Sequence, residues 1–311
     1  MMKKDTLYLH VGWSKTGTSA VQSQIQAQHA DFLAQGVLYP QSLQWPDHSH
    51  HPFALSFKGS GAYQSDMSPA DALEKLRIEM EASPAPSVLL SSELSPMYFN
   101  NPRFKEFVAE HFETVKVLFT IRPQSELLLS LFNQLVKDPN IRYDASLFTL
   151  AMRNVGWLNY LNHIRQWEQY VGEENLSVLP YSRQVVQDFL QAFDINYRQE
   201  ASQADQSVII NPSLPTRCLP LVQKYGRGQM SHGEFARRRD RIISLSRSID
   251  TDQDQYELFS LAEQQAFDAH FKQGNEKLIE WFGLEQESLN KAAYSPIHAL
   301  PEDSLSLEDL S

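Results

Sequence analysis

The sequence predicts an α/β fold with three layers, in which helices flank a mostly parallel central sheet. Short apolar segments suited to buried strands alternate with longer segments of helical composition. The first strand-like segment, residues 7–11, leads through a glycine-containing turn into a helix, an arrangement typical of anion-binding sites. Length and composition agree, because 311 residues with 42% hydrophobic and 21% charged side chains can bury a large core.

Through residue 180 the elements follow one another regularly. Prolines and polar residues mark the ends of the segments, as with Pro84 and Pro86 before a run of buried character. The segments expected to form strands are 7–11, 87–93, 115–121 and 176–180, with 36–40 as a short strand or turn. Helices are expected at 20–27, 70–82, 102–112, 124–137 and 158–171.

Beyond residue 200 the pattern is less regular. A helix is expected to begin at 211–215 and to run through Tyr225, and further helices are expected at 235–241 and 258–282, with a loop at 226–233. The polar, acidic range 290–311 is expected to be a disordered tail. Because 1–285 contains no internal repeat and no clear linker, we expect a single domain over residues 1–289.

The turn after the first strand has the features of an anion site. Gly12 and Gly17 allow close approach of the backbone, while free N–H groups and the dipole of the following helix favour negative charge. Lys15 is the only cation of the turn, and hydroxyl side chains surround it. The residues expected to bind the anion are Ser14, Lys15, Thr16, Gly17, Thr18 and Ser19.

The position of the lysine distinguishes this turn from a nucleoside triphosphatase loop. That loop reads G-x-x-x-x-G-K-[ST], whereas here Lys15 precedes the second glycine, in the order Gly12-x-x-Lys15-Thr-Gly17-Thr-Ser19. The order resembles the 5′-phosphosulfate loop of the sulfotransferases, especially the bacterial and carbohydrate-type enzymes, which carry G-x-x-K-[TS]-G-T-[TS]. The resemblance implies a P-loop-like fold, 3′-phosphoadenylyl sulfate (PAPS) as donor, adenosine 3′,5′-bisphosphate as product and no metal.

A second resemblance concerns the 3′-phosphate and the adenine of that donor. In sulfotransferases a strand ends in an arginine, and a serine follows eight residues later, as Arg122 and Ser130 do here. Both side chains can donate hydrogen bonds to the oxygens of a phosphate group. Tyr181 resembles the strand-end tyrosine near the adenine, although core packing would explain it as well.

The late R-K-G-x-x-G segment, which closes on the 3′-phosphate in the cytosolic enzymes, is missing. Several residues could replace it, and the sequence does not choose among them. The candidates are Asn211, Pro212, Ser213, Arg217, Arg237, Arg238, Arg239 and Arg241.

Sulfonate transfer requires a base that removes the acceptor proton and groups that stabilise the leaving oxygen. The resemblance gives Lys15 the second role. Glu93 stands at the strand end where amine- and tyrosine-directed relatives have a catalytic glutamate, and its apolar surroundings suggest a raised pKa. His50 and His51 compete for the role of base, although a solvated or substrate-covering loop would also explain them.

The acceptor is expected to be a small molecule or a glycan. The resemblance favours a hydroxyl or amine on a carbohydrate or glycolipid. Trp157 and Tyr160 could stack on a sugar, and His50 and His51 are further candidates for contacts with the substrate. The sequence leaves the oligomeric state open.

Composition excludes several other classes of protein. A net charge of −11 argues against nucleic acid or an anionic membrane as partner, and no apolar run is long enough for a membrane span. Cys218 is the only cysteine, so neither an intrachain disulfide nor a cysteine metal cluster can form. The first residues lack the apolar core of a secretory signal, which predicts a cytoplasmic protein.

Two rival functions remain. A P-loop small-molecule kinase would require ATP and Mg²⁺, but the position of Lys15 argues against it. A non-catalytic nucleotide-binding protein could use the same fold without turnover, and the presence of both Lys15 and Glu93 argues against that.

Overall fold

A computed structural model of the chain describes residues 3–58, 65–94, 99–182, 184–193, 195, 213–247, 249, 256–306 and 308. The chain divides into two compact units, which are described separately. The sheet unit comprises Met1–Arg122, Tyr160–Ile210 and Lys277–Ser288. The helical unit comprises Pro123–Asn159, Asn211–Glu276 and Leu289–Ser311. The single domain expected over 1–289 stays a prediction.

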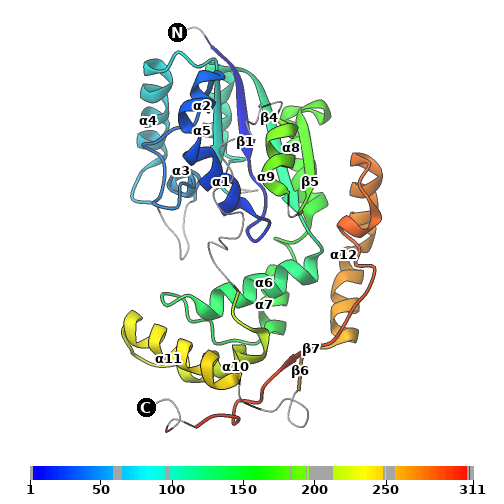
Figure 1. The fold of residues 1–311 in the computed structure, drawn as a ribbon. Helices are drawn as coiled ribbons and strands as arrows, with labels where there is room; N and C mark the ends of the chain where they lie inside the picture. Colours follow the sequence, from blue (N-terminus) through cyan, green and yellow to red (C-terminus); the bar gives the residue numbers. More distant parts are fainter. Residues whose placement is uncertain are drawn as a thin grey trace. The chain divides into compact units, whose positions relative to one another are not determined.

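The sheet unit is built on a parallel sheet with the strand order β2-β3-β1-β4-β5 (Figure 1). Its register sets Leu9 opposite Leu90 on one side and Val117 on the other. Strand β3 is buried along its whole length, as expected for a parallel strand that is covered on both faces. The strands are β1 (Lys4–His10), β2 (Val37–Leu38), β3 (Ser87–Ser91), β4 (Phe112–Ile121) and β5 (Leu176–Pro180).

Helices cover both faces of this sheet. On one face Leu89 and Leu118 pack with Val21 of α1 (Thr18–Ala27) and Phe189 of α9 (Val185–Ala192). Strand β4 alternates, so Phe119 points to the opposite face, where it contacts Trp13. The remaining helices are α2 (His29–Ala34), α3 (His51–Ser56), α4 (Pro69–Ala82), α5 (Pro102–His111) and α8 (Tyr160–Val171). The predicted three-layer α/β fold is confirmed.

Local sequence explains several helix boundaries in this unit. Helix α4 begins with a capping box, in which the Ser68 hydroxyl accepts from Asp71 N–H and the Asp71 carboxylate accepts from Ser68 N–H. Pro69 at the first helical position fits, because its missing N–H would have no intrahelical partner. The Asn101 side chain caps α5 in the same way, by accepting from Arg103 N–H.

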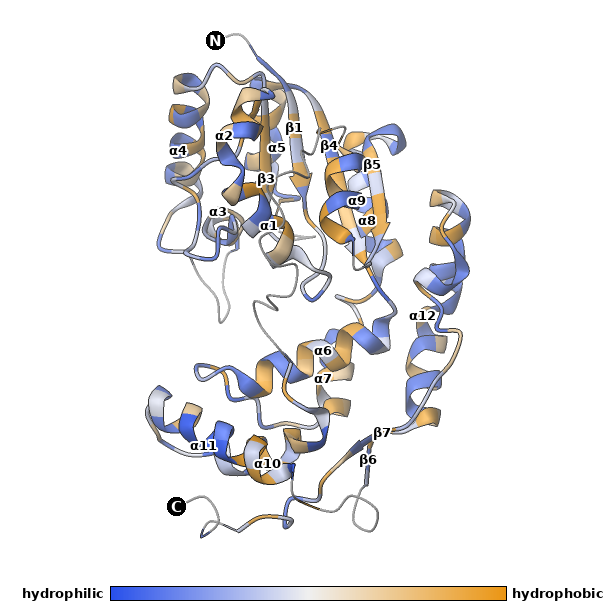
Figure 2. Cartoon of the chain, in the orientation of Figure 1, coloured by the Kyte–Doolittle hydropathy of each residue, from blue (hydrophilic) through white to orange (hydrophobic). Residues whose placement is uncertain are grey.

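The helical unit has its own apolar core. Leu128 and Phe132 of α6 (Gln124–Lys137) pack with Leu219 and Val222 of α10 (Leu219–Gly226). They also pack with Phe235 of α11 (His232–Ser246). Hydrophilic residues dominate α11 (Figure 2), which contains the expected basic segment. The other elements are α7 (Leu147–Asn154), α11 (His232–Ser246), α12 (Leu261–Phe282), β6 (Tyr256–Phe259) and β7 (Ile297–Ala299). Residues 277–282 at the end of α12 belong to the sheet unit.

Strand β7 lies inside the range expected to be a disordered tail. It pairs antiparallel with β6, and Leu300 N–H donates to the carbonyl of Arg217 at 2.8 Å. Ala299 and Leu300 are fully buried, so the apolar residues scattered among the acidic ones hold residues 297–300 against the helical unit. Among the described residues, no helix has both the length and the apolar character that crossing a membrane requires.

Candidate functional site

The turn between β1 and α1 passes very close to strand β4. Val11 N–H donates to the Leu118 carbonyl, and Trp13 N–H donates to the Thr120 carbonyl. A Cβ at Gly12 would lie 2.4 Å from the Thr120 hydroxyl oxygen and 2.7 Å from its backbone nitrogen. These distances are too short for any side chain, so glycine is required for this approach.

Two residues of the turn adopt left-handed backbone conformations, Lys15 at φ 67° and Gly17 at φ 85°. A Cβ on Gly17 would lie 2.7 Å from Val185 and 3.2 Å from the Tyr181 ring. No side chain caps α1, and its first turn holds no acidic residue. The N-terminus of α1 is therefore electropositive and its first N–H groups have no capping side chain, as an anion site requires.

The hydroxyl of Thr16 is directed into the protein. Its Oγ1 donates to the Trp13 carbonyl at 2.5 Å and lies 2.6 Å from Thr120 Oγ1. Thr16 is fully buried, so its hydroxyl is not available to a ligand. Ser14 and Ser19 are more open, being half-buried and exposed respectively.

The ammonium group of Lys15 is half-buried between charges of both signs. Burial lowers the pKa of Lys15, the Glu93 carboxylate opposes that effect, and the Arg122 guanidinium adds to it. Arg122 also donates to the backbone carbonyl of Lys15 at 3.2 Å. The structure thus brings together Lys15, Glu93 and Arg122, three residues that the sequence analysis selects for the site.

Glu93 follows β3 and is 9% exposed. Its Oε2 accepts from the Gln22 side-chain amide at 3.0 Å, and its Oε1 lies 3.6 Å from His51 Nε2. Burial raises the pKa of Glu93, but His51 and the hydrogen bonds outweigh burial and bring the pKa down to about 2. The raised pKa expected from the apolar strand is therefore wrong, because polar groups from α1 and α3 surround this carboxylate.

His50 and His51 are both buried at the start of α3, so the solvated loop that was one expectation for them is not formed. His50 Nδ1 accepts from Ser91 N–H at 3.0 Å, and its Nε2 donates to the Pro40 carbonyl at 2.8 Å. Burial lowers the pKa of His50 to about 4. Both nitrogens of His51 face protein groups, Ser92 Oγ at 2.8 Å and Glu93. Both ring nitrogens of His50 thus have protein partners, and the choice of Glu93 as the base stays a prediction.

Tyr181 lies beside the turn. Its ring is 44% exposed, and the Arg122 guanidinium lies 5.0 Å from the ring centre. The contact with Gly17 places the same ring next to the start of α1. An open aromatic face beside an arginine suits the binding of a nucleobase and a phosphate.

Among the other predicted residues, Tyr160 packs against Trp13 of this turn. Tyr160 is 1% exposed, its hydroxyl donates to the Arg122 carbonyl at 2.9 Å, and its ring lies 4.4 Å from Trp13. It supports the end of β4 and offers no open face to a sugar. Ser130 and Trp157 belong to the helical unit, so their part in the site stays a prediction.

The arginines considered for the missing late segment also belong to the helical unit. Arg217 donates to the carbonyls of Ser246 and Ile249, which ties two segments together. Arg238 donates to the Tyr225 carbonyl and Arg239 pairs with Asp240. Asn211 and Pro212 lie outside the described residues.

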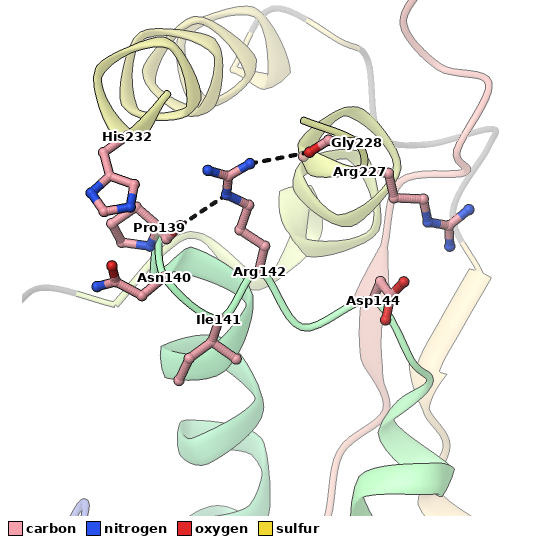
Figure 3. A pocket seen from close by; sticks show the side chains of 9 residues that line it. Pro139, Asn140, Ile141, Arg142, Asp144, Arg227, Gly228 and His232 are labelled. Atoms are coloured by element: carbon pink, nitrogen blue, oxygen red, sulfur yellow. Dashed lines mark hydrogen bonds between the residues drawn. The ribbon is translucent and has the colours of Figure 1, made fainter. Parts of the chain in front are cut away.

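Cavities also lie among the described residues of the helical unit. A polar one of about 420 Å³ lies between the loop after α6 and the start of α11 (Figure 3). The Arg142 guanidinium spans it and donates to the carbonyls of Pro139, Gly228 and Met230. An apolar one of about 350 Å³ lies between α7 and α12, where Phe148 and Met152 are exposed. Among the described residues, no three His, Cys, Asp or Glu side chains form a group that could hold a metal.

Sequence reasoning missed four polar residues beneath the turn: His10, Gln22, Ser91 and Thr120. Three of them stand at or near the carboxyl ends of β1, β3 and β4, and Gln22 lies on the buried side of α1. Polar residues at the ends of neighbouring parallel strands are a signal that the sequence carried, because those ends meet at one edge of the sheet.

A known structure resembles most of the chain. A crystal structure of a sulfotransferase from Alicyclobacillus acidocaldarius superimposes with a TM-score of 0.50 over 93% of this chain and 99% of that one, at 12% identity. The chain has the sulfotransferase fold. At this identity the likeness concerns the fold alone. No sequence-family model and no curated protein sequence matches the chain.

Proposed function

We propose that this protein transfers a sulfonate group from PAPS to a hydroxyl or amine, on a small molecule or a glycan such as a carbohydrate or glycolipid. The observation that carries the proposal is the meeting of Lys15, Glu93 and Arg122 at a glycine turn that opens a helix. When bound, PAPS supplies an activated sulfonate with a nucleotide phosphate as leaving group.

The turn has the parts needed to hold the 5′ end of the donor. The N–H groups at the start of α1 and the hydroxyl of Ser19 are available to phosphate oxygens. Lys15 would stabilise negative charge on the leaving oxygen, and its lowered pKa makes the ammonium a better hydrogen-bond donor for that purpose. Arg122 and Tyr181 would contact the 3′-phosphate and the adenine, with Ser130 as the further phosphate ligand suggested by the sequence.

Glu93 is the group proposed to take the acceptor proton. Its low pKa ensures that the carboxylate is ionised and able to accept a proton, although a carboxylate with so low a pKa is a weak base. A second anion bound nearby raises the pKa of a carboxylate. Occupation of the turn would therefore make Glu93 a stronger base when the reaction is about to occur.

Calorimetry with adenosine 3′,5′-bisphosphate and with ATP, each with and without Mg²⁺, tests this proposal against its rivals. We expect the bisphosphate to bind equally well with and without metal. Preferential binding of ATP with Mg²⁺ would reject the proposal in favour of a kinase. Bisphosphate binding without sulfonate transfer to any acceptor in a panel of glycans, phenols and amines would favour a non-catalytic nucleotide-binding protein.

A further inference from the structure

A continuous set of buried hydrogen bonds lies beneath the proposed site, and none of the roles assigned above accounts for it. The set, called here the strand-end network, connects the ends of β1, β3 and β4 with the turn and α1. All of its members belong to the sheet unit. Its members are Thr16, Thr120, His10, Ser91, Gln22 and Glu93.

His10 occupies the middle of the network. Its Nδ1 lies 2.9 Å from Ser91 Oγ and its Nε2 lies 3.4 Å from Thr120 Oγ1. The ring is fully buried, and the Phe189 ring packs at 4.8 Å from it. A Cβ on Gly12 would come within 3.3 Å of His10 Nε2. The imidazole is therefore enclosed, and its two nitrogens each reach one neighbouring strand.

The hydrogen-bond donors between the turn and His10 can be assigned by starting from Thr16. Thr16 has a single hydroxyl proton, which goes to the Trp13 carbonyl, because a carbonyl can only accept. Thr120 must then donate to Thr16, which leaves the Thr120 oxygen to accept from His10 Nε2–H. The turn side of the network therefore requires His10 to carry its proton on Nε2.

The donors on the Glu93 side follow from the same tautomer. Burial lowers the pKa of His10 to about 4, against a smaller opposing effect of Glu93, so the ring is neutral and Nδ1 is an acceptor. Ser91 then donates to His10 Nδ1, and its oxygen accepts from the Gln22 amide at 3.1 Å. The second amide proton of Gln22 reaches Glu93 Oε2. The Ser91 hydroxyl also contacts the Tyr39 side chain, and the direction of its bond to His10 follows from the neutral ring with its proton on Nε2.

We propose that His10 is a positioning residue that fixes the phosphate-binding turn relative to Glu93. It reaches the turn through Thr120 and Thr16, and it reaches Glu93 through Ser91 and Gln22. This inference rests on the proposed function, because it assigns the two ends to donor binding and to proton removal. His10 is too deeply buried to touch a substrate. Its effect on the reaction is to fix where the turn and the carboxylate stand relative to each other.

Two substitutions of His10 each remove one of its two hydrogen bonds and keep the other. In His10→Asn the side-chain oxygen can take the place of Nδ1, which keeps the bond from Ser91 and loses the one to Thr120. In His10→Gln the amide nitrogen can take the place of Nε2, which keeps the bond to Thr120 and loses the one from Ser91. One lost hydrogen bond corresponds to roughly a 5- to 10-fold effect.

The two variants should fail in different ways. His10→Asn is expected to raise the Kd of adenosine 3′,5′-bisphosphate by about 5- to 10-fold with little change in kcat. His10→Gln is expected to lower kcat by a similar factor with the Kd of the bisphosphate unchanged. Equal losses of affinity and kcat in both variants, or no loss in either, would overturn the inference.

Three further variants guard against misfolding of the His10 variants. Thr120→Val removes one hydroxyl at constant shape and should resemble His10→Asn, and Thr120→Ser should restore the affinity. Ser91→Ala removes the other hydroxyl and should resemble His10→Gln. Reversed or identical behaviour of Thr120→Val and Ser91→Ala would also overturn the inference.

Histidine NMR on the unliganded protein separates failure of this inference from failure of the proposed function. We expect neutral His10 with its proton on Nε2 down to about pH 5. A proton on Nδ1, or a charged ring at neutral pH, would overturn the network assignment even in an active enzyme. If the expected tautomer is found but the wild type neither binds the bisphosphate nor transfers sulfonate, the proposed function fails and the positioning role fails with it.

Discussion

Buried polar side chains serve different ends in the two units. In the helical unit they form closed local sets, in which Asp268 accepts from Ser125 N–H, the Ser125 hydroxyl and the Tyr294 hydroxyl. In the sheet unit the strand-end network connects several of them and includes Glu93, beside Lys15. We infer that the strand-end network bears on function because it reaches charged groups at the proposed site. Elsewhere such bonds hold elements together.

The sharpest test of this contrast is Glu93→Gln, which keeps the shape and removes the charge. We expect kcat to fall by about 100- to 10,000-fold, because the proton acceptor is lost. Calorimetry should find the Kd of adenosine 3′,5′-bisphosphate within a few-fold of the wild type. The matched control is Glu110→Gln, at an exposed position on α5. Near-normal turnover of Glu93→Gln would remove Glu93 from the role of base.

Replacing Lys15 by methionine should give the next largest effect. Loss of one preorganised cation from the site is expected to lower kcat/KM by about 100- to 1000-fold. Thermal stability should be unchanged or slightly higher, since burial disfavours the charged form of this lysine. Lys75→Met on the exposed side of α4 is the control. A variant with wild-type kcat/KM would contradict the role of Lys15 at the leaving oxygen.

The low pKa of Glu93 predicts a particular acid sensitivity. Because the folded-state pKa, about 2, is below the ordinary value of 4.5, the ionised group stabilises the fold above pH 4.5. That contribution, on the order of 3 kcal/mol, is lost as the pH falls from about 4.5 to 2. Chemical denaturation at several pH values should show a smaller loss over this range in Glu93→Gln. Parallel curves for the two proteins would contradict the depressed pKa.

The helical unit offers the opposite case. Asp268→Ala leaves the donors of Ser125 and Tyr294 without their acceptor and should lower the free energy of unfolding by about 1–3 kcal/mol. The Kd of the bisphosphate should stay the same, and Asp303→Ala at an exposed position should change neither quantity. If Asp268→Ala raised the Kd of the bisphosphate and left the free energy of unfolding unchanged, the contrast between the units would be contradicted.

The parts predicted correctly are those set by local sequence. The alternation of strands and helices, the glycine turn and the place of Glu93 after β3 all follow from short segments. Since parallel strands present their carboxyl ends at one edge, the proximity of Lys15 and Glu93 follows from the predicted sheet. The helix 124–137 agrees with α6 at both ends, because Pro123 and Asp138 bound an apolar helical pattern.

The errors concern partners that are distant in sequence. The pKa of Glu93 depends on Gln22 and His51, which lie 71 and 42 positions before it. His50 is buried although its neighbours in the sequence are polar. Its ring accepts a hydrogen bond from Ser91 N–H and donates one to the Pro40 carbonyl. In both cases the packing of helices and loops against the strand ends brings the partners together, and no pattern within a single segment indicates them.

The left-handed backbone of Lys15 has a consequence for the history and engineering of this protein. For a residue with a Cβ this conformation costs about 1–2 kcal/mol, whereas glycine adopts it without strain. The chain therefore keeps a locally unfavourable residue at the point where its side chain is proposed to act. Selection for heat resistance alone would replace Lys15 by glycine or asparagine, so retention of lysine in thermostable variants would indicate selection for activity at this position.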